Sequence, residues 1–149
     1  MSKKSKNEIS DLLHLQVAMQ KCITDNCKTE YNKMKKITEN FHKKMKKILK
    51  DLQQNKITSE QWTQKVSDLT IEMYETTQRF NLVKCQVDEC KKETKAAALA
   101  AINVFLKNYK RGHPIHKLVK KYKKIFEKRI TAEDVQAFDI EFQKLKHHL

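Results

Sequence analysis

The chain has 149 residues, one glycine, one proline and a formal net charge of +14 at neutral pH. So few turn-forming residues exclude a protein rich in strands and tight turns, and they predict an all-α chain. A single glycine also excludes a glycine-rich phosphate-binding loop, and the length fits one unit rather than two globular domains. Both ends of the chain are basic, whereas residues 57–106 are nearly neutral.

The first predicted element is a long amphipathic helix. From Ile23 to Leu52 the apolar residues recur at a mean step of about 3.6 residues, which is the period of an α-helix. An apolar stretch at 9–19 precedes this pattern. Together they predict a helix over about 8–54.

The second predicted element has a well-marked start. Thr58 and Gln61 have the spacing of a capping box, in which each side chain bonds the backbone N–H of the other residue. From Trp62 onward apolar residues follow alternating steps of four and three residues, which is the heptad pattern of coiled-coil packing. We expect a helix over about 58–111, with Gly112 as its C-terminal cap.

Two shorter helices are predicted at the C-terminal end. Pro114 suits the first turn of a helix, and apolar residues on one side extend this helix over about 114–128. Thr131 can cap a fourth helix over about 131–148. The four predicted helices therefore belong to a single elongated helical unit.

The order of these helices predicts a long antiparallel hairpin that resembles a coiled coil and turns near Lys56. Apolar residues spread beyond one stripe at 9–19 and at 96–106, so each of these zones needs more than one neighbour. We expect the short C-terminal hairpin to pack back there and form a four-helix head. Residues 28–84 would then form a two-helix stalk.

The four cysteines form two Cys-x4-Cys pairs that are mirror images about Lys56. Two cysteines of one pair are about 7.5 Å apart along a helix, which exceeds the separation that a disulfide tolerates. Across the predicted hairpin, Cys22 faces Cys90 and Cys27 faces Cys85. The spacing therefore predicts the disulfides Cys22–Cys90 and Cys27–Cys85.

Two other interpretations of the cysteines remain open at this point. Cys27 and Cys90 fall on the apolar seams, where reduced cysteine acts as a small hydrophobic residue. A zinc site built from all four cysteines ranks third, because zinc-binding pairs usually come from tight C-x2-C turns. We therefore predict no metal site.

Paired cysteines on two helices resemble the twin-cysteine helical hairpins, such as the twin C-x9-C and C-x3-C proteins of the mitochondrial intermembrane space. The x4 spacing of this chain departs from both of those families. A basic, lysine-rich chain with paired cysteines also resembles small virion proteins of large DNA viruses, which carry their own thiol oxidases. Both resemblances imply disulfide formation without a secretory signal.

The C-terminal part of the chain is a candidate surface for polyanions. Residues 107–129 contain ten lysines or arginines and a single acidic residue, and 33–50 form a second basic block. Such charges would bind nucleic-acid phosphates without reading sequence, and anionic lipid heads or an acidic protein surface would suit them equally well. Lysine-rich helix faces are also common as plain solvated surface. The predicted polyanion-binding residues are Lys107, Lys110, Arg111, Lys117, Lys120, Lys121, Lys123 and Lys124.

The sequence offers no recognisable nucleophile, redox or cofactor motif, so we expect a non-enzymatic protein without a cofactor. The first residues lack the apolar core of a signal peptide, and the longest apolar run, 96–106, is far shorter than the ~20 residues of a membrane span. We expect a soluble structural or assembly protein whose partners are other protein subunits.

The setting that fits best is the virion of a large DNA virus, as a minor capsid or internal component. The alternative is a sequence-independent protein that binds or packages nucleic acid in the host cytoplasm or nucleus. A second alternative is an adaptor or chaperone of the mitochondrial intermembrane space.

Overall fold

The computed structural model describes residues 3–145. Within this range the chain folds into seven α-helices and no strand, so the all-α prediction is confirmed. The helices are α1 (Lys3–Asn26), α2 (Lys28–Gln53), α3 (Ser59–Tyr74), α4 (Thr77–Glu89), α5 (Lys91–Asn108), α6 (Pro114–Lys128) and α7 (Ala132–Leu145).

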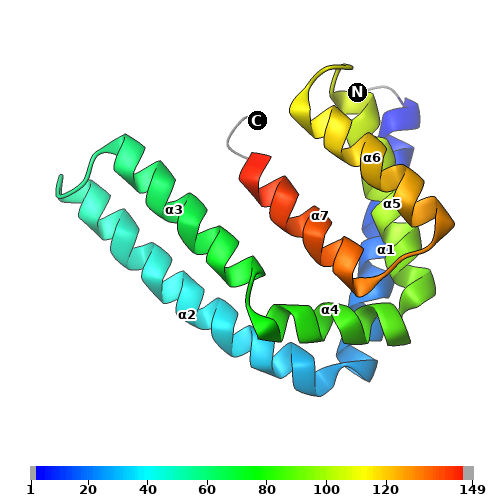
Figure 1. Ribbon diagram of the computed structural model, residues 1–149, viewed down its shortest axis with the longest axis horizontal. Coiled ribbons are helices and arrows are strands. Elements are labelled where there is room, and N and C mark those ends of the chain that lie inside the picture. Colours follow the sequence, from blue (N-terminus) through cyan, green and yellow to red (C-terminus); the bar gives the residue numbers. More distant parts are fainter. Residues whose placement is uncertain (1–2, 146–149) are drawn as a thin grey trace.

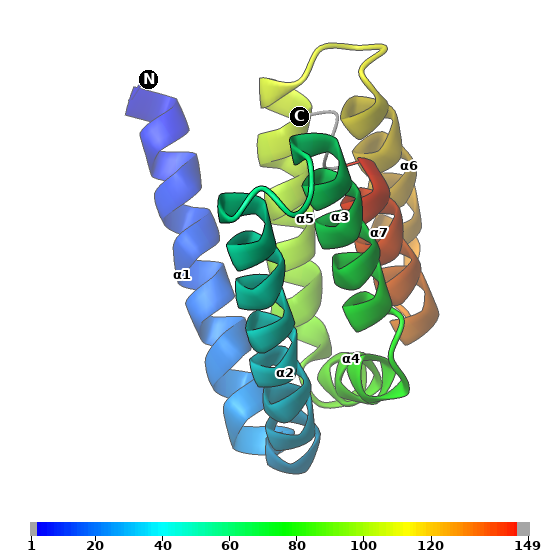
Figure 2. The ribbon, with the colours of Figure 1, turned by 90° about the vertical axis from the view of Figure 1, so that its left-hand side faces the viewer.

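The helices are arranged in two groups with α7 between them (Figure 1). On one side α2 lies along α3 and also contacts α4. On the other side α1 packs along α5, and α5 packs along α6. Figure 2 shows α1 at the outer edge and α4 nearly end-on below α3 and α7. The long α1–α5 and α2–α3 contacts join segments that precede Lys56 to segments that follow it.

Both long predicted helices are interrupted in the structure. The helix expected over 8–54 is two helices that meet at Cys27, and the one expected over 58–111 is three helices. The second of these predictions also ends too late, because α5 stops at Asn108. Cys27 and Cys90 mark two of the three breaks, and Thr76 lies in the third.

The break before α4 has a local cause. The side-chain oxygen of Thr76 accepts a hydrogen bond from the backbone N–H of Arg79 at 3.1 Å. Its backbone is extended, with φ −67° and ψ 147°. A threonine in this position caps a new helix, because its side chain replaces a missing backbone partner at the helix start. The chain therefore changes direction between α3 and α4.

The position of α7 differs from the predicted four-helix head. Besides its neighbour α6, α7 packs against α3 and α4. The side-chain amide of Gln136 donates to the backbone carbonyl of Tyr74, which ties α7 to the end of α3. The chain changes direction between α3 and α4, and α3 lies alongside α7 of the C-terminal hairpin. Residues 28–84 are therefore not a bare two-helix stalk.

Three of the four predicted helix starts agree with the structure, whereas α1 begins at Lys3 rather than near residue 8. Thr58 and Gln61 form a complete capping box, with bonds of 2.9 and 3.1 Å. Thr131 accepts a bond from the backbone N–H of Asp134 at 3.2 Å and caps α7. α6 covers the predicted range 114–128. The last residues predicted for the fourth helix, 146–148, lie outside the described part of the chain.

Gly112 does not cap α5 directly. The helix ends four residues earlier, where the backbone of Tyr109 becomes extended with φ −118° and ψ 134°. The ring of Tyr109 then packs against the ring of His113 at 4.8 Å between centroids. Gly112 has a φ of +92°, a conformation that side-chain-bearing residues rarely adopt, so it shapes the connection to α6.

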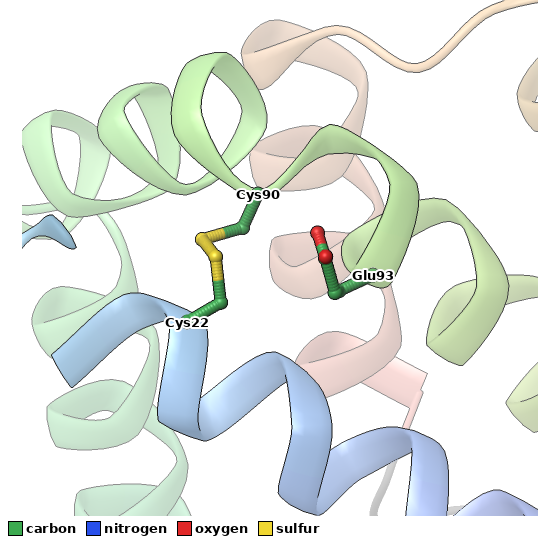
Figure 3. Close-up of side chains that lie close together, drawn as sticks. All are labelled: Cys22, Cys90 and Glu93. Atoms are coloured by element: carbon green, nitrogen blue, oxygen red, sulfur yellow. A yellow bond between two sulfur atoms is a disulfide. The ribbon is translucent and has the colours of Figure 1, made fainter. Parts of the chain in front are cut away.

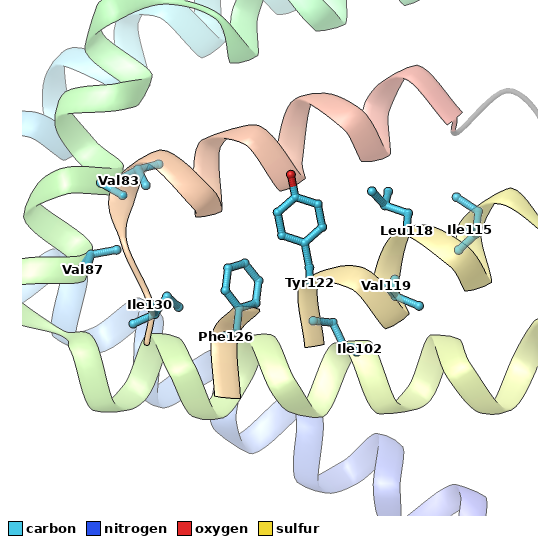
Figure 4. Close-up of a cluster of buried hydrophobic side chains, with 10 residues drawn as sticks. Val83, Val87, Ile102, Ile115, Leu118, Val119, Tyr122, Phe126 and Ile130 are labelled. Carbon is cyan, nitrogen blue, oxygen red and sulfur yellow. The ribbon is translucent and has the colours of Figure 1, made fainter. Parts of the chain in front are cut away.

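The main hydrophobic core lies where α4, α5, α6 and the start of α7 meet (Figure 4). Phe126, Ile102, Ile115, Val83 and Val119 are its most completely buried large side chains. A second, smaller core surrounds the cysteines. No helix within residues 3–145 has both the length and the apolar character that a bilayer crossing requires.

Candidate functional site

The four cysteines form two disulfides in the structure, Cys22–Cys90 and Cys27–Cys85. These are the pairs that the mirror-image spacing predicts. In both, the Cα atoms are 6.0 Å apart. Each disulfide joins one fully buried cysteine, Cys27 or Cys90, to a partly exposed one. The bridges therefore join the two halves of the chain where α1, α2, α4 and α5 come together.

The two buried cysteines occupy equivalent helix breaks. Cys27 has φ −125° and ψ 38°, and Cys90 has φ −126° and ψ 38°. Each cysteine ends one helix and is the N-cap of the next. The backbone hydrogen bonds into and out of both residues are all 2.8 Å long. The helix axis can therefore bend at each cysteine while the helical hydrogen-bond pattern continues.

The two partly exposed cysteines, Cys22 and Cys85, also have equivalent surroundings. The sulfur of Cys22 lies 3.8 Å from the carbonyl oxygen of Glu89, and the sulfur of Cys85 lies 3.8 Å from that of Asn26. Each sulfur thus contacts the residue just before the opposite buried cysteine. The segments around the two cysteine pairs are related by a local two-fold pattern, which exchanges one disulfide with the other.

A repeated sequence underlies this pattern. Residues 21–30 read KCITDNCKTE and residues 84–93 read KCQVDECKKE, so both contain Lys-Cys-x-x-Asp-x-Cys-Lys-x-Glu. The prediction used the spacing of the cysteines alone and missed the shared lysines, aspartate and glutamate. Aligning the two segments on their cysteines would have found the repeat.

The glutamate of each repeat lies beside a disulfide. Glu30 is in the first turn of α2 and Glu93 is in the first turn of α5, where a carboxylate interacts favourably with the helix dipole. In each copy a carboxylate oxygen and both sulfurs of the adjacent disulfide lie within 4.8 Å of one another. Figure 3 shows this arrangement for Cys22, Cys90 and Glu93. Both glutamates are partly buried.

A cavity of about 520 Å³ lies beside this region, between α1, α2, α4, α5 and α7. Its walls are mainly apolar and include side chains from both repeated segments. Equivalent positions in and beside the two segments line it in pairs, such as Ile23 with Gln86 and Met19 with Leu82. The cavity therefore follows the same two-fold pattern as the disulfides.

An ion pair at the wall of this cavity joins α4 to α7. The guanidinium of Arg79 donates to the carboxylate of Asp139 at 2.8 Å, and about a quarter of each side chain is exposed, 24% and 23%. Burial raises the pKa of the Asp139 carboxyl above its ordinary value, and the charge and hydrogen bond of Arg79 oppose this rise. The carboxyl therefore holds its proton to a higher pH in the folded protein.

Replacing Arg79 with glutamine should raise the pKa of Asp139 further, because the opposing positive charge is lost. The pKa of Asp139 is higher in the folded chain than in the unfolded chain. The contribution of this carboxyl to the free energy of unfolding is therefore fully present below the unfolded pKa. It is lost as the pH rises through the folded pKa. The variant should therefore lose about 2 kcal/mol at neutral pH and less under acid conditions. Carbon NMR titration of Asp139 and unfolding curves at several pH values measure both effects. Arg111→Gln, which removes an exposed arginine, should change neither.

Most of the predicted polyanion-binding residues are exposed. On α6, Lys117, Lys120, Lys121 and Lys124 are exposed, whereas Lys123 is partly buried. Lys121 and Lys123 have only long ion pairs, 3.9 Å to Glu141 and 4.0 Å to Glu127. These lysines therefore form one largely uncompensated face of the helix.

The remaining predicted residues lie at and beyond the end of α5. Lys107 makes an ion pair with Glu8 of α1, so part of its charge is already neutralised. Lys110 and Arg111 are exposed in the connection to α6. Tyr109, between Lys107 and Lys110, is partly buried. The aromatic residues among the lysines of α6, Tyr122 and Phe126, are only 3% and 1% exposed. They belong to the core and cannot serve as stacking platforms for bases.

The second basic block lies on α2. Its lysines are exposed, and none of them forms an ion pair among those found within residues 3–145. Figure 1 places α2 and α6 at opposite sides of the molecule. The exposed lysines of this block are Lys33, Lys35, Lys36, Lys43, Lys44, Lys46, Lys47 and Lys50.

No protein family, curated protein or solved structure matches this chain in the comparisons with known proteins.

Proposed function

We propose that this protein is a non-enzymatic structural component that works as a subunit of an assembly. The two nested disulfides support this proposal best, because they fix the geometry of four helices at one junction. A subunit of a particle benefits from such a fixed shape. The virion of a large DNA virus, as a minor capsid or internal protein, is the setting that we propose.

The outer face of α1 is the surface that we assign to contacts between subunits. Leu13 and Val17 lie one turn apart on this helix and are 56% and 68% exposed. Two neighbouring apolar side chains on a charged protein favour contact with another apolar surface, although single exposed apolar residues are ordinary.

Sedimentation velocity of the oxidised chain tests this proposal. We expect self-association that persists at high salt, because apolar contacts are not screened. The double variant Leu13→Lys/Val17→Lys should be monomeric. His14→Lys/Ala18→Lys is the matched control, since it adds lysines at two exposed positions with the same spacing. A chain that is monomeric under all conditions would contradict assembly through this face.

A second candidate function is sequence-independent binding of nucleic acid. The uncompensated lysine faces of α2 and α6 favour it. Lysine provides a mobile point charge rather than the bidentate contacts by which arginine reads guanine, so no sequence preference is expected. Binding would depend on the release of counterions from phosphates.

Binding to a short DNA duplex should weaken steeply with salt. If about five phosphates are neutralised, the affinity should fall by about three orders of magnitude between 50 and 200 mM salt. Replacing Lys117, Lys120 and Lys124 with glutamine should reduce the slope of log affinity against log salt, whereas Lys65→Gln on α3 should leave it almost unchanged. Fluorescence anisotropy measures the slope. Affinity that does not depend on salt would rule out this candidate.

A further inference from the structure

We propose that the reduced chain binds two zinc-like divalent cations, one in place of each disulfide, through two cysteine thiolates and one glutamate. One site consists of Cys22, Cys90 and Glu93, and the other of Cys27, Cys85 and Glu30. This inference does not depend on the proposed assembly function. It concerns the state of the protein in which the disulfides are open.

The arrangement of the donor atoms is the first argument. In both groups the two sulfurs and one carboxylate oxygen lie within 4.8 Å of one another. Zinc binds thiolate sulfur at about 2.3 Å and carboxylate oxygen at about 2.1 Å, so donors around one ion are about 3.5 to 4 Å apart. Once a disulfide is open, its sulfurs need only separate by side-chain rotation. The three donors then surround a common point, and a fourth position stays free for water.

The repeat is the second argument. A glutamate beside one disulfide would be explained by its place in the first turn of a helix. Here the same residue follows the buried cysteine at the same spacing in both copies, and both carboxylates reach their sulfurs. Neither Glu30 nor Glu93 forms one of the ion pairs found within residues 3–145. Their carboxylates are therefore not committed to a lysine.

The lysines beside the cysteines compensate the charge of the thiolates that a metal requires. Cys27 and Cys90 each end one helix and begin the next, so the helix dipoles give their sulfurs no net advantage. Cysteines near lysines ionise more readily than free cysteine. Each repeat also has a lysine beside each of its cysteines. Two thiolates and a carboxylate can therefore be held in a protein with a net charge of +14.

The disulfide and the metal site exclude each other. A dithiol reductant transfers two electrons and two protons to each disulfide, becomes a disulfide itself and leaves two thiols on the protein. A divalent cation then displaces both thiol protons and binds the two thiolates together with the glutamate. Thiolate donors favour zinc over magnesium or calcium, which prefer oxygen ligands. The bound ion would connect the same helices as the disulfide does.

Cobalt titration of the reduced full-length chain tests the proposal. The protein is reduced with a phosphine, which takes up oxygen from water and becomes a phosphine oxide, and is then desalted without air. We expect two Co²⁺ ions per chain, with a thiolate-to-cobalt charge-transfer band, and no such band in the oxidised chain. Zinc should displace the cobalt and raise the unfolding temperature of the reduced chain.

The glutamates provide variants that leave every cysteine in place. Glu30→Gln and Glu93→Gln should each weaken one of the two sites by at least about tenfold, and the double variant should weaken both. Glu89→Gln is the matched control, because it removes an exposed carboxylate next to Cys90 that belongs to neither group. Circular dichroism follows the helical content throughout.

Several results would overturn the proposal. One is the absence of a charge-transfer band from the reduced chain, whether it remains helical or unfolds. Another is cobalt binding that responds to Glu89→Gln as strongly as to the two site variants, since the thiols would then bind metal without the predicted geometry. A stoichiometry of a single ion bound by all four cysteines would also overturn it.

Discussion

Opening both disulfides should lower the free energy of unfolding by about 7 kcal/mol, whereas losing either one alone should lower it by only about 3 kcal/mol. The bridges close loops with sequence separations of 58 and 68 residues. Either loop alone restricts the unfolded chain by about 4 kcal/mol in the chain-entropy account. Once one bridge exists, the second closes only the short ring between the two, which restricts the chain by about 3 kcal/mol.

Denaturant unfolding of four forms measures these differences: the oxidised chain, the fully reduced chain, Cys22→Ala/Cys90→Ala and Cys27→Ala/Cys85→Ala. Comparing each variant with the native chain after reduction of both proteins corrects for packing lost at the buried cysteine. All samples must be free of divalent metal. If the two single losses of unfolding free energy add up to the loss on opening both bridges, the proposed coupling between the bridges is wrong.

The local signals of the sequence were sufficient for the ends of several helices. Pro114 and Thr131 begin new elements because each satisfies a requirement of a helix start by itself. The capping box of Thr58 works in the same way. Such interactions join residues within four positions of one another, so no knowledge of the fold is needed to predict them.

The breaks at Cys27 and Cys90 could not be predicted from periodicity. At both residues the backbone hydrogen bonds between positions four apart are kept, so the apolar pattern passes through without a change of phase. The position of α7 could not be predicted either, because it depends on the turn before α4 and on contacts with α3, which is remote in sequence. Periodicity defines the face of a helix, but it does not identify the partner of that face.

The cysteine pairing was predictable because a disulfide joins two identical residue types and so leaves a spacing that can be tested. The glutamates beside the disulfides were missed for the opposite reason. Glu30 and Glu93 are two of many charged residues in the chain, and only alignment of the two repeats sets them apart. The repeat is present in the sequence, but the prediction rested on the mirror-image spacing of the cysteines alone.

Replacing Phe126 with alanine should destabilise the protein by about 4 kcal/mol, which is typical of a large aromatic side chain removed from a core. Its ring is 1% exposed and packs against Tyr122 and Phe138, with centroids 5.6 and 6.0 Å away. These rings hold α6 against α7, so the substitution leaves a void where the two helices meet. Figure 4 shows Phe126 and Tyr122 within the core. Denaturant unfolding measures the change in free energy.

Phe41→Ala on α2 is the matched control, because the same atoms are removed from a partly exposed position. It should cost less, about 2 kcal/mol, since part of its surface stays in contact with water in the folded chain. Equal losses from the two substitutions would mean that the core around Phe126 is not closely packed.

Because Phe126→Ala removes no charge, the folded variant should keep the salt dependence of DNA binding if α6 binds phosphates. A changed slope in this variant would show that the lysines of α6 need a rigid helix to bind.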